Sequence, residues 1–358
     1  MMTTFADLEA QAARLRARFP APLTDSGRIA LYGAGFLGSW AITWLKAQGI
    51  EPVGCIDGDA GKQGQLLEGV EIHGIEALPA LAPDLTLITA RHAVGPVSDR
   101  LAQAGCAAVS LDAWYVADQI ARFAECLAQL EDERSRETLI AVLSAMLSGD
   151  RAPLSTVWEP SQYFCLPRFC GIEREAYVDA GAYVGDSIER FIWANAGVFS
   201  TIHAFEPAPR QFAALTARRD RLDQEWALEP DQIRLNQAGL SSGSGRMSAK
   251  SASGLLQSVA LQTSTEGEIA AVSLDAYLEG EKVTLIKADV EGMELPLLAG
   301  AAQTIRRYRP KLAICVYHYP PDIPEIMAEI RGLVPDYRFS LRHHSPQLME
   351  TVLYAWVE

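Results

Sequence analysis

The sequence predicts an α/β protein in which two successive sheets are joined by a helical connector. Residues 28–57 and 175–206 each read as an apolar strand, a glycine-containing turn, an amphipathic helix and a second strand. Between them, residues 113–148 carry apolar side chains at spacings of three and four, which is typical of helices. A chain of 358 residues suffices for two domains with cores of their own. We therefore expect an N-terminal domain over residues 1–112, a connector over 113–152 and a larger domain over 153–358.

Composition and charge limit the kinds of molecule that the protein can bind and the compartment that it occupies. The net charge of -14 disfavours binding to nucleic acid or to an anionic membrane surface, because phosphates are repelled. No apolar run approaches the roughly 18 residues that span a bilayer, and the first 19 residues have helical rather than signal-peptide character. The six cysteines form neither a C-x-x-C pair nor a disulfide framework. These features predict a cytoplasmic protein with no membrane span.

The first glycine motif follows a strand and precedes a helix, as a dinucleotide-binding loop requires. Gly33, Gly35 and Gly38 match G-x-G-x-x-G, and Asp57 follows at the distance where an acid can meet a ribose. Residues 64–81 read only as a short extended excursion, and after the strand at 85–88 and the helix at 94–103 one further strand, 107–111, is expected. The domain is therefore shorter than a full dinucleotide fold. It resembles the small Rossmann-like domains that precede sugar-modifying transferases, so both a nucleotide or nucleotide-sugar site and an unliganded scaffold remain open.

The connector should consist of two helices separated by the polar residues 131–134. Gly149 and Pro153 close the second helix. The apolar stripe favours packing against a flanking domain, and a helix-mediated homodimer is the alternative. The loop that follows is rich in aromatic residues, including Trp158, Tyr163 and Phe164, which can cover a neighbouring site.

The second glycine loop differs from the first in what it can bind. Asp179 ends a strand, Gly181 and Gly185 frame the turn, and Glu206 follows the next strand. Two sparse glycines with no following lysine do not make a pyrophosphate cradle, whereas an acid past the second strand can accept hydrogen bonds from both ribose hydroxyls. A nucleoside with an amino-acid tail and no phosphates fits this loop, and S-adenosylmethionine is such a molecule.

The C-terminal third places two acids and a histidine at one sheet edge. Asp289 and Glu291 follow the strand that begins at Val283, a helix with one apolar face runs from near Met293 towards Pro310, and His318 follows the strand at 312–317. Further strands are expected at 232–236, 337–342 and 351–357, and the last two should pair antiparallel. Five alternating units closed by such a pair describe the seven-stranded sheet of S-adenosylmethionine-dependent methyltransferases.

The same stretches resemble the FkbM family of methyltransferases. The resemblance rests on YVDAGAYVGDS, HAFEPAPRQFAAL, LNQAGLSS and above all LIKADVEGMELPLLAGA followed by RPKLAICVYH, and it covers residues 155–358. It implies transfer of a methyl group from S-adenosylmethionine to a hydroxyl of a sugar, glycan or related natural product.

We expect a defined set of residues to carry this reaction. His318 is the preferred general base, with a pKa near about 6.5, and Asp289 can instead accept the proton, orient His318 or contact the cofactor. Asp179 can equally hydrogen-bond the backbone of the glycine loop. The expected cofactor-binding residues are Asp179, Gly181, Tyr183, Gly185, Asp186, Glu206, Asn236 and Asp289.

Three alternatives remain at the level of sequence. Asp289, Glu291, Glu294 and His318 can form a site for a hard metal ion, although no metal is expected, and Glu294 more simply caps a helix. A nicotinamide-dependent oxidoreductase acting through the N-terminal loop lacks a catalytic set such as Tyr-x-x-x-Lys. A binding module that senses a nucleotide sugar would not need Glu206, Asp289 and His318 in these positions.

Overall fold

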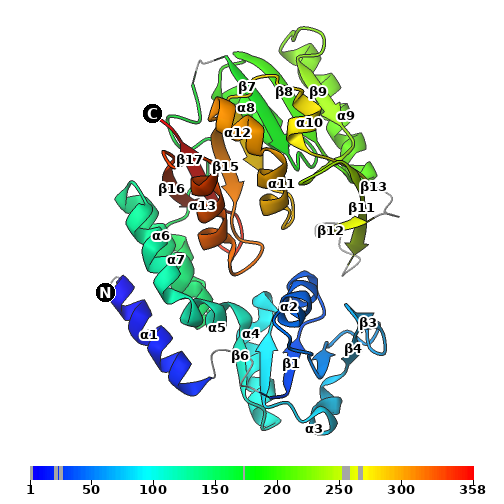
Figure 1. Ribbon diagram of the computed structural model, residues 1–358, viewed down its shortest axis with the longest axis vertical. Coiled ribbons are helices and arrows are strands. Elements are labelled where there is room, and N and C mark those ends of the chain that lie inside the picture. The colour runs from blue at the N-terminus through cyan, green and yellow to red at the C-terminus, as the bar shows by residue number, and fades with distance from the viewer. Residues whose placement is uncertain (1–2, 20–22, 24–26, 172–173, 252–258, 265–268) are drawn as a thin grey trace.

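The computed structural model describes residues 3–19, 23, 27–171, 174–251, 259–264 and 269–358. Two sheets with their own helices form the two ends of the molecule, and a layer of helices runs along one side between them (Figure 1). That layer consists of α1 (Phe5–Arg18), α5 (Leu111–Asp118), α6 (Ile120–Gln129) and α7 (Glu133–Ser148). Among the described residues, no helix is long and apolar enough to cross a membrane.

The N-terminal sheet has the strand order β3-β4-β2-β1-β5-β6. Its strands are β1 (Ile29–Tyr32), β2 (Gly54–Ile56), β3 (Leu66–Leu67), β4 (Val70–His73), β5 (Leu85–Ile88) and β6 (Ala108–Ser110). Its helices are α2 (Phe36–Ala47), α3 (Leu78–Leu81) and α4 (Val94–Gln103), with short 3₁₀ turns at Ile75–Ala77 and Arg91–Ala93. The predicted extended excursion is a hairpin whose second strand, β4, lies parallel to β2 with Cys55 beside Ile72. The domain is thus a doubly wound sheet of five parallel strands with one antiparallel edge strand.

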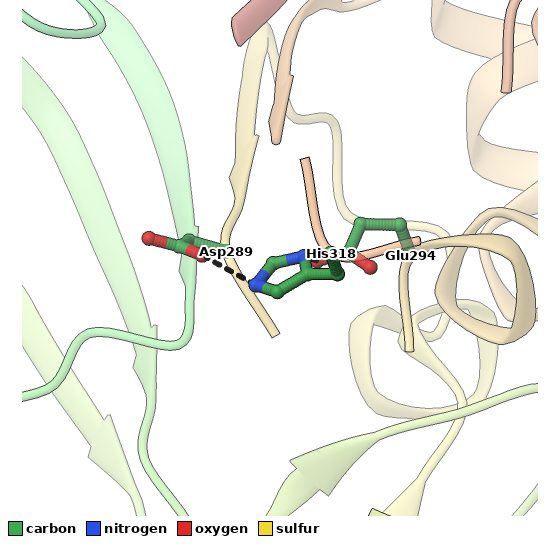
Figure 2. Close-up of side chains that lie close together, drawn as sticks. All are labelled: Asp289, Glu294 and His318. Carbon is green, nitrogen blue, oxygen red and sulfur yellow. Dashed lines mark ion pairs between the residues drawn. The ribbon is translucent and has the colours of Figure 1, made fainter. Parts of the chain in front are cut away.

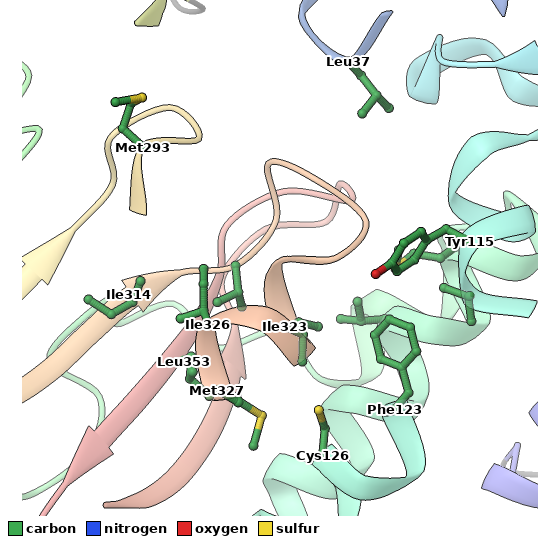
Figure 3. Packing of buried hydrophobic residues seen from close by; sticks show 14 of the residues in the cluster. Leu37, Tyr115, Phe123, Cys126, Met293, Ile314, Ile323, Ile326, Met327 and Leu353 are labelled. Atoms are coloured by element: carbon green, nitrogen blue, oxygen red, sulfur yellow. The ribbon is translucent and has the colours of Figure 1, made fainter. Parts of the chain in front are cut away.

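The connector helices pack against both flanking parts of the chain. Asp132 caps α7 by accepting a hydrogen bond from the Ser135 amide, and Gly149 ends that helix in the left-handed conformation with φ 74°. A single apolar cluster reaches from the N-terminal sheet through the connector to the C-terminal sheet (Figure 3). Because close-packed cores resist sliding, this cluster fixes the two sheets relative to each other. Helix α1 packs on α5 and α7.

The C-terminal sheet has seven strands in the order β16-β17-β15-β14-β7-β8-β9. They are β7 (Glu175–Ala180), β8 (Phe199–Phe205), β9 (Ile233–Asn236), β14 (Leu285–Ala288), β15 (Lys311–Cys315), β16 (Arg338–His343) and β17 (Thr351–Trp356). Only β17 runs antiparallel, inserted between β15 and β16. This order is that of the class I methyltransferase sheet, so the predicted fold class is confirmed.

The helices of this domain follow the predicted alternation with one difference. They are α8 (Asp186–Ala194), α9 (Pro209–Glu225), α10 (Leu274–Leu278), α11 (Glu294–Gly300), α12 (Ala302–Tyr308) and α13 (Asp322–Leu333). The expected single helix before Pro310 is two helices that meet at Ala301. A Cβ at Gly300 would overlap the backbone of Ser241, so this close approach requires glycine where the helix is interrupted.

A second, small sheet was not predicted. It has the order β10-β13-β11-β12 and consists of β10 (Gly239–Leu240), β11 (Gly245–Ser251), β12 (Val259–Ser264) and β13 (Ile269–Val272). The serine- and glycine-rich sequence of residues 240–258 gave no strand signal, and its last part, 252–258, lies outside the described residues.

Candidate active site

One large cavity of about 1030 Å³ lies where the carboxyl-terminal edges of the two sheets face each other. Residues after β7, β8, β14 and β15 line it from the C-terminal domain, and Phe36, Arg91 and His92 line it from the N-terminal domain. In open α/β sheets this edge is where ligands bind. The cavity therefore brings together Gly181, Glu206, Asp289 and His318 of the C-terminal domain, whereas Gly33, Gly35, Gly38 and Asp57 are not among the residues that line it.

The second glycine loop and Glu206 form one side of the cavity. Gly181 has φ 74°, and a Cβ there would overlap the carbonyl oxygen of Asp289, so the loop approaches the end of β14 as only glycine allows. The Glu206 carboxylate accepts hydrogen bonds from the amides of Tyr183 (2.9 Å) and Ala208 (2.8 Å). Burial raises the pKa of Glu206, although these two amides oppose the rise. An acid is thus held at the end of β8 with its side chain facing the cavity.

The other predicted cofactor residues take different positions. Tyr183 is 43% exposed, and Asp186 begins α8 at the cavity wall. Asn236 donates to the Ala204 carbonyl (3.2 Å) and the Tyr277 hydroxyl (3.1 Å), and it is not among the residues that line the cavity. Asp179 lies beneath the loop rather than at the cavity surface.

Asp179 forms a buried ion pair that the sequence did not predict. Lys287 and Asp179 are register neighbours on β14 and β7, and their Nζ and Oδ1 atoms lie 3.0 Å apart. The same ammonium donates to the Gly181 carbonyl at 2.6 Å. Burial favours the neutral amine, but Asp179 and Asp289 outweigh it and raise the pKa of Lys287. The pair therefore ties the glycine loop to the central strands.

His318 lies between carboxylates from two elements (Figure 2). Its Nδ1 atom is 3.2 Å from Glu294 and its Nε2 atom is 3.5 Å from Asp289. Glu291 is 3.6 Å from the same Nε2 atom. Burial lowers the pKa of His318, but Glu294, Asp289 and Glu291 outweigh it and raise the pKa to about 10. The expectation of a pKa near about 6.5 is therefore wrong, and His318 is an imidazolium at neutral pH.

Asp289 is held as a carboxylate by hydroxyl donors and nearby cations. Tyr163 and Tyr317 donate to its two oxygens at 3.0 Å and 3.1 Å. Burial raises the pKa of Asp289, but Lys287 and His318 outweigh it, so the net shift is downward. Tyr163 confirms that the aromatic loop after the connector reaches the site.

Glu291 has the properties of a proton acceptor at neutral pH. Its backbone is left-handed with φ 53°, which is uncommon outside glycine and is concentrated at functional sites. Its side chain is 40% exposed and lines the cavity. Burial raises its pKa to about 7, with Asp289 and Glu294 adding to the rise and His318 opposing it.

The acidic cluster also has the spacing of a metal site. One atom from each of Asp289, Glu294 and His318 lies within 4.8 Å of the other two. Oxygen and imidazole ligands suit several divalent ions. In the structure, however, the imidazole ring itself lies between the two carboxylates, so the imidazolium already pairs with both and offsets part of their negative charge (Figure 2).

The N-terminal glycine loop closes on its own acid. Asp57 accepts a hydrogen bond from the Ala34 amide at 2.7 Å and lies 3.4 Å from Lys62. A Cβ at Gly38 would overlap the Gly33 carbonyl, so this glycine allows α2 to pack closely on β1. Gly35 has open space around it. The loop thus has the geometry of the motif, and Asp57, the acid expected to meet a ribose, is already bound by neighbouring groups of the chain.

Several residues at the site gave no recognisable signal in the sequence. Lys287 stands alone in an apolar strand, and its role follows only from its register with Asp179. Phe36 reaches the site from the N-terminal domain, far away along the chain. The sequence placed Glu291 at the sheet edge but did not show the orientation of its carboxylate.

Comparison with known proteins agrees with the class that the sheet defines, a methyltransferase. Residues 179–341 match the sequence model described as the methyltransferase FkbM domain. The C-terminal part of the chain therefore contains a methyltransferase FkbM domain.

The structure is also similar to solved structures. A methyltransferase FkbM from Methylobacillus flagellatus KT superposes with a TM-score of 0.62 at 23% identity, covering 99% of both chains, which shows a shared fold for both domains. An rRNA methylase from Streptococcus thermophilus gives a TM-score of 0.34 at 16% identity, over 52% of this chain and 90% of that one. Fibrillarin from Aeropyrum pernix, solved with natively bound S-adenosyl-L-methionine, gives 0.32 at 16% identity, over 62% and 75%. The last two scores are too low to support a functional conclusion, and a search of the curated proteins found no match.

Proposed function

We propose that the protein is an S-adenosylmethionine-dependent O-methyltransferase that acts on a hydroxyl of a sugar, glycan or related natural product. The observation that carries this proposal is that Glu206 and the Asp289–His318 pair line the same cavity of a methyltransferase-type sheet. An acid suited to a ribose and an ionised cluster suited to proton transfer are thus within reach of one bound nucleoside.

The chain's groups fit such a cofactor. Glu206 has carboxylate lone pairs beyond the two that the loop amides use, and these can accept hydrogen bonds from ribose hydroxyls. Gly181, Tyr183 and Asp186 line the cavity beside Glu206, where they can face the amino-acid tail, and Gly185 holds the loop close to Leu215. When bound, S-adenosylmethionine supplies a methyl group on a sulfonium that an acceptor oxygen can displace in line.

The acceptor proton passes to a carboxylate in this proposal. His318 is already protonated at neutral pH, so it serves as a fixed cation that holds Asp289, Glu294 and Glu291 in place. Glu291 lines the cavity and has a pKa of about 7, which suits a general base. Asp289, fixed by Tyr163 and Tyr317, orients the acceptor hydroxyl or the cofactor's ammonium.

The proposal is tested by transfer of a labelled methyl group. The purified protein is incubated with methyl-labelled S-adenosylmethionine and a panel of neutral glycosides, oligosaccharides and nucleotide sugars, and the products are analysed by mass spectrometry. Label on a hydroxyl oxygen, with S-adenosylhomocysteine formed in equal amount, is the expected result. A protein that binds neither S-adenosylmethionine nor S-adenosylhomocysteine in calorimetry would contradict it.

A further inference from the structure

The N-terminal glycine motif has no role in the proposed methyl transfer, yet its helix faces the reacting groups. Helix α2 begins at Phe36, directly after the loop. The Phe36 ring stacks on Tyr319 at a centroid distance of 5.1 Å and an interplanar angle of 8°. The edge contact between Phe36 and His318 has a centroid distance of 6.2 Å. One turn further along α2, Trp40 stacks on the same tyrosine at 4.9 Å.

A second loop of the N-terminal domain, which contains Arg91, hydrogen-bonds the backbone at Tyr317 and His318. Arg91, just after β5, donates from Nη1 to the carbonyls of Tyr317 (2.6 Å) and His318 (3.1 Å). Its Nε and Nη2 atoms form a bidentate pair with Asp112 at 2.8 Å and 2.7 Å. Charge-assisted bidentate bonds are strong and directional. The position of the His318 segment is therefore set by the N-terminal domain.

The lining of the cavity indicates the chemistry of what Phe36 faces. Phe36, Tyr317 and Met349 present apolar surface to the cavity, and Glu291 and Glu350 line the same cavity. The cationic side chains in this lining include Arg91, which pairs with Asp112, Lys287, which pairs with Asp179, Arg151, which donates to Gln347, and Arg210. Carboxylates accept hydrogen bonds from hydroxyl groups and repel phosphates. An aromatic ring packs against the C–H face of a saturated ring. The set suits a neutral ring that carries several hydroxyl groups.

We propose that the N-terminal domain forms the acceptor-binding wall of the methyltransferase site, and that Phe36 packs against a neutral polyhydroxylated ring of the acceptor. The glycine loop then serves to place Phe36: Asp57 binds the Ala34 amide, and Gly38 lets α2 pack on β1 with its first residue facing the cavity. This inference rests on the proposed function, because it assigns the acceptor side of that same site.

The test uses the full chain loaded with S-adenosylhomocysteine and a panel of methyl glycosides of neutral hexoses and 6-deoxyhexoses. Saturation-transfer NMR should detect binding of at least one glycoside to the wild type. Phe36→Ala should weaken that binding about threefold to tenfold, the range for one lost aromatic contact, and Phe36→Trp should largely retain it. Trp193→Ala removes an exposed aromatic ring that does not line the cavity, and it should leave glycoside binding unchanged.

Calorimetry with S-adenosylhomocysteine on the same samples distinguishes failure of the proposed acceptor-binding wall from failure of the proposed methyltransferase function. If Phe36→Ala binds S-adenosylhomocysteine as tightly as the wild type but binds the glycoside more weakly, the result supports the N-terminal domain as the acceptor-binding wall. No glycoside binding to the loaded wild type, or undiminished binding in a folded Phe36→Ala variant, overturns it. Displacement of the glycoside by NAD or by uridine diphosphate would overturn it as well, because a nucleotide would then occupy the wall.

Discussion

The two sheets of this protein share one local hydrogen-bond arrangement, but the acid in it has different surroundings in each sheet. In each, the acid after the second strand accepts a hydrogen bond from an amide of the glycine loop that follows the first strand. Asp57 binds the Ala34 amide at 2.7 Å and Glu206 binds the Tyr183 amide at 2.9 Å.

The two acids, Asp57 and Glu206, differ in the groups that surround them. Asp57 lies 3.4 Å from Lys62, and the helix that begins at its loop packs Phe36 on Tyr319 of the other domain. In the part of the chain that the structure describes, Glu206 forms no ion pair, and it opens on the cavity of about 1030 Å³. A strand–glycine–helix–acid pattern therefore predicts a loop conformation, and what lies opposite the loop decides whether a ligand can use it.

The largest effect is expected at the acids beside the open loop. Glu291→Gln should lower turnover about 10² to 10⁴-fold, because a general base is lost while the shape is kept. Glu279 is a matched control, since it also has a left-handed backbone, φ 48°, but does not line the cavity. Glu279→Gln should retain wild-type turnover in the same assay with labelled cofactor.

The outcome also decides between carboxylates and a metal ion. Cofactor affinity should be unchanged in Glu291→Gln when measured by calorimetry. If Glu291→Gln keeps full turnover and Asp289→Asn loses turnover, then Asp289, and not Glu291, accepts the proton. Inactivation of the wild type by a chelator, with recovery on adding a divalent ion, would assign Asp289, Glu294 and His318 to a metal.

The pH dependence of the rate sharpens the assignment further. The pKa of Glu291 is about 7 and that of His318 about 10. Because the base must be deprotonated, kcat should rise about thirtyfold between roughly pH 5.5 and 8.5 if Glu291 accepts the proton. A rate that still rises about tenfold per pH unit above about pH 8.5 and levels off only above about pH 11 would identify His318 instead.

The same histidine makes stability depend on pH, an effect smaller than those on turnover. Its pKa is raised to about 10 in the folded protein, so its contribution is fully present below about pH 6.5 and is lost as the pH rises. The free energy of unfolding should fall by about 1 kcal/mol per pH unit between roughly pH 7.5 and 9.5. Urea titrations should show a flatter dependence on pH for His318→Asn than for the wild type. Equal slopes in the two proteins would mean that His318 is not a buried cation.

Much of the fold could be read from the sequence because its signals are local. Strand and helix periodicity, the glycine loops and the antiparallel final pair predicted the C-terminal sheet, and residues 131–134 predicted the break between the connector helices. The polar spacing after the strands also brought Asp289 and His318 together correctly, 3.5 Å apart.

What the sequence could not provide depends on contacts between distant segments. The raised pKa of His318 results from Glu294, Asp289 and Glu291 surrounding one buried ring, and the sequence does not show their orientation. The hydrogen bond from the Ala34 amide to Asp57 and the ion pair of Asp57 with Lys62 likewise depend on side-chain placement that the sequence does not show. The serine-rich run before β12 lacked the alternation that marks a strand.

The comparison of the two loops is tested most directly by titrating S-adenosylhomocysteine into three proteins in a calorimeter. Glu206→Ala should weaken binding about thirtyfold relative to the wild type, because charge-assisted hydrogen bonds to the ribose are lost. Asp57→Ala should bind within about twofold of the wild type, since its loop does not contact the cofactor. Unchanged affinity in a folded Glu206→Ala variant, or a large loss in Asp57→Ala, would contradict the assignment of the cofactor to the C-terminal sheet.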